Sequence, residues 1–222
     1  ILPKQGKYDR STMSVTETVS RNQATSQQKC LQVANQQTNP LAEFPEYLSY
    51  KCTASDGKEL QLKLQCKRKA DMDPKLLKWA FKLAERNVGP QYRACSLGWQ
   101  PKIKQADLNK AWARYLVATD VATRKPAAYT MFRFDLDYGR SVLYCYELQV
   151  EAEFQRKGLG AFMMKALEQM ARHFCMERVV LTVLKNNEDG MRFYRRLGYD
   201  VDEMSPDKEE DAAYEIMSKA MV

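Results

Sequence analysis

The chain has 222 residues, of which 45% are hydrophobic, and it carries a formal net charge of +7 at neutral pH. This length and apolar content suffice for one large domain. There is no apolar run long enough to span a bilayer and no signal peptide, so we expect no membrane insertion. The basic charge permits contact with nucleic acid or ribosomes. Lysines and arginines are spread along the chain, however, which favours an ordinary solvated surface.

The cysteines and the histidine exclude several classes of chemistry. Six cysteines are scattered without a Cys-x-x-Cys pair, which argues against a zinc site or a disulfide framework and for a reducing compartment. The single histidine, His173, falls among apolar residues near the end of a predicted helix, where a structural role is favoured. Catalytic triads built on histidine are therefore poor candidates, and no bound metal is expected.

The periodicity of apolar residues divides the chain into a tail and one domain. Residues 1–18 are polar and aperiodic and are predicted to be a disordered or vector-derived tail, followed by a single domain over 19–222. The predicted elements, in chain order, are a weak helix over 19–37, a strand over 60–66, a helix from Asp73 to about Pro90, a second helical stretch with Tyr92, Leu97 and Trp99, strands over 113–118, 127–134 and 142–150, a helix over 159–174, a strand over 179–184, a helix from Asn187 to Gly198, an extended segment over 199–201 and a last strand over 213–217. This order predicts an α/β domain with a mixed sheet.

The most informative stretch is the strand over 142–150 and the turn that follows it. The turn, Gln155-Arg-Lys-Gly-Leu-Gly160, leads the chain from this strand into a helix. Its two glycines let backbone N–H groups approach a ligand closely. Such amides at a helix N-terminus favour a pyrophosphate, and the arginine and lysine add positive charge. A dinucleotide-binding fingerprint and a P-loop do not fit, because no Gly-x-Gly-x-x-Gly occurs and the lysine precedes the glycines.

This turn and a second motif resemble the GNAT superfamily of N-acetyltransferases. Gln-x-x-Gly-x-Gly is similar to the family's acetyl-CoA signature, and Asn187, Tyr194 and Leu197-Gly-Tyr199 follow at the family's spacing. The resemblance implies the GNAT fold, a mixed and mostly antiparallel sheet flanked by helices. It also implies acetyl-CoA as the co-substrate.

More specific segments, over roughly residues 20–220, resemble the NatD-type N-terminal acetyltransferases of that superfamily. These segments are Asn-Pro-Leu…Phe-Pro at 39–45, Cys-Lys-Arg at 66–68, Trp-Ala-Phe-x-Leu at 79–83, Phe-Arg-Phe-Asp at 132–135, Val-Leu-Tyr-Cys-Tyr-Glu at 142–147, Arg-Lys-Gly-Leu-Gly at 156–160, Leu-Thr-Val at 181–183 and Tyr-Glu-Ile at 214–216. The family acetylates the α-amine of histones four and two A, which begin Ser-Gly-Arg-Gly.

The resemblance therefore implies this activity, with N-terminal peptides of core histones as partners and the ribosome as an optional further one. It implies a cytoplasmic and nuclear location, no membrane or metal, and an extra N-terminal helix packed on the domain. Direct binding of nucleic acid is not expected.

The same resemblance assigns roles to individual residues. Acetyl-CoA contacts are implied for Leu148, Gln149, Val150, Arg156, Lys157, Gly158, Leu159, Gly160, Ala161 and Asn187. Peptide contacts are implied for Tyr92, Asp135, Leu136, Asp137, Tyr144, Tyr146, Thr182, Ser205 and Tyr214. Two positions depart from the family pattern: Leu97 stands where members carry tryptophan, and Asp137 where a glutamate is usual.

Acetyl transfer to an amine needs a group that accepts the amine's proton. A peptide α-amine titrates near 7.7–8.0, against about 10.4 for lysine, so one carboxylate can serve. Glu147 is the predicted base, directly or through water; Tyr146 would position the amine or relay its proton, and Tyr194 is a second candidate acid. The N–H of Leu148 is the predicted donor to the carbonyl oxygen. Glu147 shares a face with Tyr144 and Tyr146 only if a bulge or splay interrupts the strand near residue 147.

Other functions stay open on sequence alone. In one alternative, a protein with the same fold acetylates a lysine or a small amine. The paired tyrosines and acids argue against this alternative, because they suit a longer peptide. A non-catalytic module that binds acetyl-CoA or nucleic acid is another, against which intact Glu147, Gly158, Gly160 and Asn187 count. Acids are also concentrated near the predicted acceptor site, at Asp135, Asp137, Glu147, Glu151 and Glu153. A cationic acceptor explains them, unless they pair with Arg133, Arg140 or Arg156 at the surface.

Overall fold

The computed structural model describes residues 15–54 and 56–221. The first helix, α1 (Val15–Gln36), begins inside the predicted tail, because its sequence contains no proline or glycine that would stop it. Residues 1–14 of that tail lie outside the described residues. The predicted tail is therefore too long by four residues at its C-terminal end.

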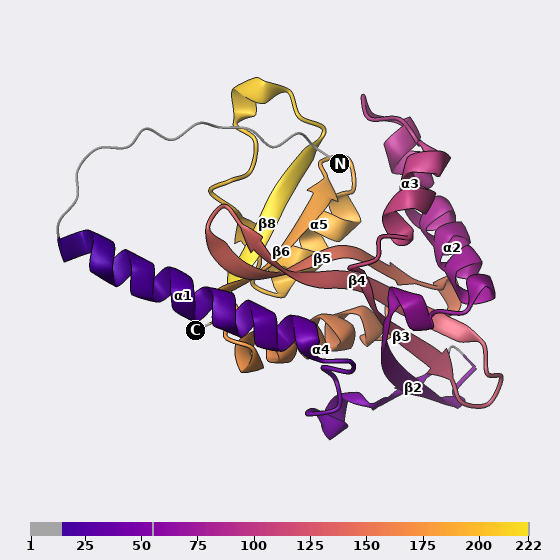
Figure 1. Cartoon of the computed structure of the whole chain (residues 1–222). Helices are drawn as coiled ribbons and strands as arrows, with labels where there is room; N and C mark the ends of the chain where they lie inside the picture. The colour runs from indigo at the N-terminus through magenta and orange to yellow at the C-terminus, as the bar shows by residue number, and fades with distance from the viewer. Residues whose placement is uncertain (1–14, 55, 222) are drawn as a thin grey trace.

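An eight-stranded sheet forms the centre of the molecule (Figure 1). The strands are β1 (Ser49–Thr53), β2 (Glu59–Arg68), β3 (Arg114–Asp120), β4 (Pro126–Asp137), β5 (Arg140–Val150), β6 (Arg178–Leu184), β7 (Asp200–Val201) and β8 (Tyr214–Ala220). Their order is β1-β2-β3-β4-β5-β6-β8-β7. Only the pairing of β5 with β6 is parallel within the described sheet, and the other neighbours are antiparallel. This architecture confirms the predicted α/β fold with a mixed, mostly antiparallel sheet.

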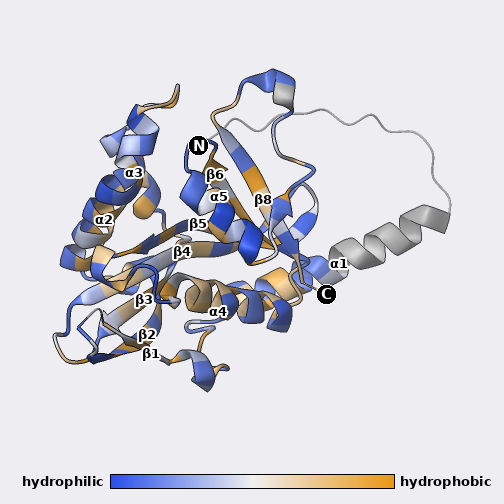
Figure 2. Cartoon of the chain, turned by 180° about the vertical axis from the view of Figure 1, so that it is seen from behind, coloured by the Kyte–Doolittle hydropathy of each residue, from blue (hydrophilic) through white to orange (hydrophobic). Residues whose placement is uncertain are grey.

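Helices cover both faces of the sheet. The remaining helices are α2 (Pro74–Arg93), α3 (Pro101–Leu108), α4 (Leu159–His173) and α5 (Glu188–Arg196). Apolar residues of α4, α5 and the C-terminal end of α1 share one core with β4, β5 and β6, on what we call the α4 face. A second core joins α2 and α3 to β3 and β4 on the opposite, α2 face. Figure 2 shows apolar residues along the central strands, whereas α5 is mostly hydrophilic. None of the helices within the described ranges is long and apolar enough to cross a membrane.

Two local predictions were wrong. The helix expected to end near Pro90 continues to Arg93, so Tyr92 belongs to α2, while Leu97 and Trp99 precede α3. A proline inside a helix costs about 3 kcal/mol. Tertiary contacts of the same helix offset part of this cost: the Asn87 amide donates to the Val150 carbonyl at 3.1 Å. Strand β1 was not predicted, because an alternation of five residues with only two apolar members, Tyr50 and Cys52, is too short to stand out.

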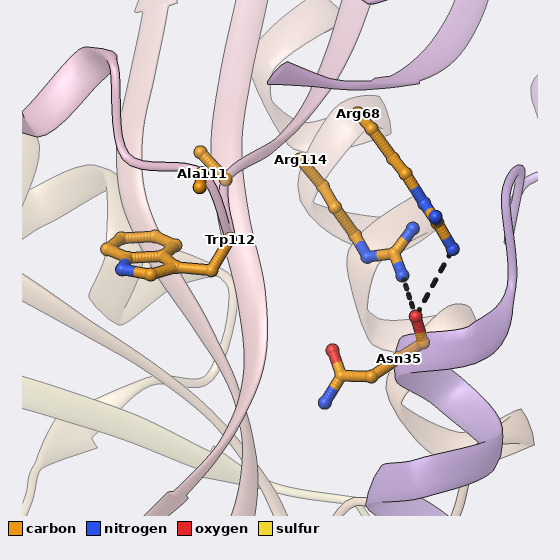
Figure 3. A pocket seen from close by; sticks show the side chains of 6 residues that line it. Asn35, Arg68, Ala111, Trp112 and Arg114 are labelled. Carbon is orange, nitrogen blue, oxygen red and sulfur yellow. Dashed lines mark hydrogen bonds between the residues drawn. The ribbon is translucent and has the colours of Figure 1, made fainter. Parts of the chain in front are cut away.

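Two arginines fasten the C-terminal end of α1 to the sheet (Figure 3). The Arg114 guanidinium donates to the carbonyls of Gln37 at 2.7 Å and Asn35 at 2.8 Å, and Arg68 donates to the Gln36 carbonyl at 2.8 Å. These cations lie where the helix dipole is negative. They line a cavity of about 180 Å³. Because the arginines that line this cavity bind the C-terminal carbonyls of α1, we assign the cavity to the packing of that helix and not to the active site.

Candidate active site

The strands β5 and β6 separate halfway along their length. Their parallel register ends at the pair Cys145–Leu181. Beyond this point, the N–H of Glu151 donates to the Ala127 carbonyl of β4 at 2.8 Å. Because peptide groups alternate in direction along a strand, those of Leu148 and Val150 point away from β4, into the wedge between β5 and β6. The wedge therefore offers backbone donors at the position predicted for acetyl-CoA.

A bulge in β5 lies at the predicted place. Met131 of β4 pairs with Glu147, and the next residue, Phe132, pairs with Cys145, so Tyr146 is the extra residue. The bulge reverses the alternation of side chains. Glu147 consequently leaves the α4 face, on which Cys145 lies, and joins Tyr144 and Tyr146 on the α2 face. The prediction that an irregularity near residue 147 brings these three side chains together is confirmed.

The Glu147 carboxylate is buried and held at both oxygens. Its side chain is 8% exposed, and its Oε1 accepts from the Lys104 ammonium of α3 at 2.5 Å. Its Oε2 accepts from the Gln149 amide at 2.8 Å, and Gln149 accepts in turn from Asn87 of α2 at 3.1 Å. The Lys104 ammonium also lies 5.2 Å from the centre of the Tyr92 ring. Helices α2 and α3 thus both fix the predicted base.

Aromatic side chains extend this site along the α2 face. The ring centres of Tyr144 and Tyr146 lie 4.6 Å apart, and the ring centre of Trp112 lies 4.9 Å from that of Tyr146. The Tyr144 hydroxyl is 2.7 Å from the Thr182 hydroxyl of β6. Burial raises the pKa of Tyr144 and Tyr146, so both phenols stay protonated at neutral pH. Tyr214 of β8 is half-buried, and burial also raises its pKa.

The predicted acids of β4 lie beside these tyrosines. Asp135 forms an ion pair with Arg133, whose guanidinium lies 4.6 Å from the Trp112 ring centre. Burial is the largest cause of the raised pKa of Tyr146. The Arg133 cation lowers this pKa, and the Asp137 carboxylate raises it by a smaller amount. Both acids are partly exposed. In the free protein Asp135 therefore already has a cationic partner, as the surface-pair alternative predicts.

Two predicted peptide contacts are not brought into this cluster. Leu136 lies between Asp135 and Asp137 and is 41% exposed; strand alternation places its side chain on the opposite face. The Ser205 hydroxyl accepts from the Ile216 N–H at 3.0 Å, so it closes the loop before β8. Leu136 is therefore kept out of the cluster by the alternation of side chains along the strand, and Ser205 by its hydrogen bond within the loop.

The glycine turn ends in a helix without a side-chain cap. Gly158 is the N-cap of α4 with φ +80° and, as a glycine, offers no side chain to cap the first amides of that helix. Arg156 is exposed and pairs loosely with Asp189 of α5 at 3.3 Å. Asn187 caps α5 by accepting from the Gly190 N–H at 3.1 Å. Unsatisfied amides at a helix N-terminus beside two cations fit a pyrophosphate, so this turn would hold that part of acetyl-CoA.

The remaining predicted acid, Tyr194, lies on α5 on the other side of β5. It is half-buried against Phe193 and Tyr199, with ring centres 5.0 and 5.9 Å away. Burial raises its pKa well above the ordinary value, and the electrostatic interactions with Cys145 and Glu147 act in the same direction. Tyr194 is therefore a protonated hydroxyl in the electrostatic field of the predicted base.

Sequence reasoning missed three residues of the cluster: Lys104, Trp112 and Arg133. Lys104 and Trp112 lie in irregularly patterned segments before β3, where no motif marks them. Arg133 was considered only as a surface partner of the acids. The places of Lys104 and Trp112 depend on how α3 and the segment after it pack across the sheet, which no local pattern reports, whereas strand alternation puts Arg133 on the same face of β4 as Asp135. Among the described residues, no group of three or more His, Cys, Asp or Glu side chains is placed to hold a metal ion.

A sheet split between parallel strands, with an uncapped glycine turn at the wedge, defines an acyl-CoA-dependent N-acyltransferase. Comparison with known families agrees. The Acetyltransferase (GNAT) family matches residues 76–199, more than half of the chain. The chain therefore belongs to the GNAT acetyltransferases, which use acetyl-CoA, and it transfers an acyl group.

Solved structures of other acyltransferases share this fold. An acyl-CoA N-acyltransferase from Pseudomonas aeruginosa aligns with a TM-score of 0.53 and 19% identity, over 72% of this chain and 99% of that one. The ribosomal-protein-S18-alanine N-acetyltransferase from Escherichia coli aligns with a TM-score of 0.50 and 17% identity, over 71% and 94%. Arabidopsis thaliana NAA60 in complex with a bisubstrate analogue gives 0.50 and 11%, over 71% and 97%. At these identities the likeness concerns the fold.

Proposed function

We propose that this protein transfers the acetyl group of acetyl-CoA to the α-amine of proteins that begin Ser-Gly-Arg-Gly, the N-terminal sequence of histones four and two A. The observation that carries the proposal is the bulge at Tyr146. It puts a buried carboxylate, Glu147, at the end of a row of tyrosines and acids on one sheet face. Such a row suits an extended, cationic peptide that presents its first residue to the base.

The residues divide the chemistry as follows. Acetyl-CoA supplies the activated acetyl group. Glu147 would accept the proton of the α-amine, directly or through water, and the Tyr146 hydroxyl would orient that amine. The N–H of Leu148, which points into the wedge, would donate to the carbonyl oxygen of the acetyl group. Tyr194 would give its proton to the leaving thiolate, which its raised pKa permits because the hydroxyl is protonated at the outset.

The choice of an N-terminal acceptor rests on charge and on the amine itself. Removing the proton of an α-amine at pH 7 costs about 3 kcal/mol less free energy than removing that of a lysine. A base that is already paired with Lys104 can therefore serve. Asp135 and Asp137 lie on one face of β4, near the tyrosine pair. Either acid would form a charge-assisted hydrogen bond with the arginine of Ser-Gly-Arg-Gly.

The proposal also covers the binding partners of the protein and its location in the cell. N-terminal peptides of core histones would be the acceptors, with the ribosome as a further partner that presents nascent chains, and the protein would act in cytoplasm and nucleus. These parts rest on the resemblance to NatD-type enzymes, and the net charge of +7 is compatible with them. The alanine N-acetyltransferase from Escherichia coli is a structural neighbour whose name states a protein acceptor.

One experiment tests the acceptor. The protein is incubated with acetyl-CoA and a Ser-Gly-Arg-Gly peptide that carries an internal lysine, and fragmentation mass spectrometry locates the acetyl group. The control peptide has the same sequence with a blocked α-amine. We expect acetylation of the first residue and none of the control. Acetyl-lysine in the control would show a lysine acceptor instead, and no acetylation of either peptide would contradict the proposal.

A further inference from the structure

A lysine outside every recognised motif contacts the predicted base. Lys104 lies on α3, and its ammonium meets Oε1 of Glu147 at 2.5 Å. The two side chains are only 15% and 8% exposed. Burying two charges is costly, and their attraction repays that cost only in good geometry. A pair this buried at the end of a row of polar side chains therefore calls for a reason beyond stability.

The groups around this pair are neutral, apart from one acid. The titratable groups that interact electrostatically with Glu147 or Lys104 are Tyr92 from α2, Asp107 from α3, Tyr115 from β3, Tyr129 from β4, Cys145 from β5 and Tyr194 from α5. Burial raises the pKa of the four tyrosines and of Cys145, which keeps them uncharged near neutral pH. Among these groups, Lys104 is thus the cation that offsets the Glu147 charge.

The ion pair also keeps Lys104 protonated. Burial by itself lowers the pKa of this ammonium, but the opposing attraction of Glu147, with smaller contributions from Tyr92 and Asp107, raises it above the ordinary lysine value. A cation of this kind does not titrate in the range in which acetyl transfer is measured. Its charge beside Glu147 is therefore constant with pH.

We propose that Lys104 is a positioning residue for the acetyl transfer proposed above: from α3 it supplies the opposite charge to the buried Glu147 and fixes one of its oxygens. Gln149 fixes the other oxygen at 2.8 Å, and Asn87 fixes Gln149. The carboxylate is thus oriented from two helices, and its remaining lone pairs would be left for the acceptor amine or a water. Without the cation, a buried carboxylate is left without its opposite charge in a neutral surrounding, which is costly, and one of its oxygens is no longer fixed.

The test is a set of variants assayed with acetyl-CoA and the Ser-Gly-Arg-Gly peptide. Lys104→Met removes the charge at similar volume, and Lys104→Arg keeps the charge. Lys102→Met, on the exposed side of the same helix, is the matched control. Each variant is compared for kcat, KM, acetyl-CoA affinity and the pH dependence of kcat/KM. Lys104→Met is also measured in the Glu147→Gln background.

If Lys104 acts through Glu147, Lys104→Met lowers kcat about tenfold or more with little change in acetyl-CoA affinity. The acid limb of its pH profile moves upward by about one pH unit, the low end for the loss of a neighbouring opposite charge. In the Glu147→Gln background the same change has almost no further effect on kcat. Lys104→Arg keeps the wild-type acid limb, and Lys102→Met behaves as wild type.

Several results would overturn the inference. An equal loss in both backgrounds, with an unmoved acid limb, would mean that Lys104 only docks α3. A gain in kcat from Lys104→Met would mean that the lysine obstructs the amine. If Lys104→Met does not fold, Lys104→Arg decides, because an acid limb that moves while the charge is kept contradicts the idea. The wild-type rate on the peptide tests the proposed function separately, and the variants are compared on whichever amine the protein accepts.

Discussion

The packing of the turn requires a glycine at position 158, independently of any ligand. A Cβ added to Gly158 would lie 2.5 Å from the hydroxyl oxygen of Tyr50, and the residue has φ +80°. The Tyr50 hydroxyl donates to the Lys157 carbonyl at 2.6 Å, so β1 is bonded to the turn at that point. We therefore expect Gly158→Ala to perturb the fold as well as any cofactor contact.

The magnitude follows from two separate costs. A left-handed backbone costs an alanine about 1–2 kcal/mol relative to glycine. The new methyl group also displaces the Tyr50 hydroxyl, which loses a hydrogen bond worth about 0.5–1.5 kcal/mol. Gly158→Ala should thus lower the free energy of unfolding by about 1.5–3.5 kcal/mol. Tyr50→Phe removes the same hydrogen bond and should cost about 0.5–1.5 kcal/mol.

The double variant distinguishes this explanation from others. With Tyr50→Phe the obstructing hydroxyl is gone, and the next ring atom would be 3.8 Å from the new Cβ, an ordinary contact. The hydrogen bond is then lost only once, so the double variant should be less destabilised than the two single variants together, by about 0.5–1.5 kcal/mol.

Urea unfolding of the four proteins measures this cycle. Gly57→Ala is the matched control, because Gly57 has φ +85° and no atom within 4 Å of an added Cβ. It should show the backbone cost alone, about 1–2 kcal/mol, and no coupling with Tyr50→Phe. Additive effects of Gly158→Ala and Tyr50→Phe, within about 0.3 kcal/mol, would refute the reasoning.

Three further predictions concern the site and the core. Glu147→Gln should lower kcat about a hundredfold or more at nearly unchanged acetyl-CoA affinity; wild-type turnover would remove Glu147 as the base. Asp135→Asn should weaken kcat/KM for Ser-Gly-Arg-Gly by about 1.5–3 kcal/mol and barely affect Ser-Gly-Ala-Gly, whereas equal losses would show that Asp135 only pairs with Arg133. Burial raises the pKa of Tyr115 and Tyr129, so the stability they contribute is fully present below about pH 10 and is lost above it. Thermal unfolding should therefore move to lower temperature above about pH 10, and an unchanged melting temperature up to about pH 11 would contradict this.

The local features of the fold could be predicted because short-range physics sets them. Asp73, at which the sequence places a helix start, is the N-cap of α2 and accepts from the Lys75 N–H at 2.7 Å. Gly158 stands at the predicted turn into α4, where only a residue that tolerates positive φ fits easily. Apolar periodicity predicted the helix over 159–174, and the buried apolar residues of α4 lie together in one core. Even the bulge in β5 was foreseen, because a regular strand separates Glu147 from Tyr146.

The sequence by itself thus determined the order of elements, the glycine turn and the choice of Glu147. Only the tertiary structure decided what surrounds that carboxylate: Lys104 arrives from α3, forty-three positions away along the chain. It likewise placed the Trp112 ring on Tyr146 and under the Arg133 guanidinium. The physical reason is that capping, turns and periodicity act over a few residues, whereas a buried ion pair or a ring contact depends on how helices and strands pack across the sheet.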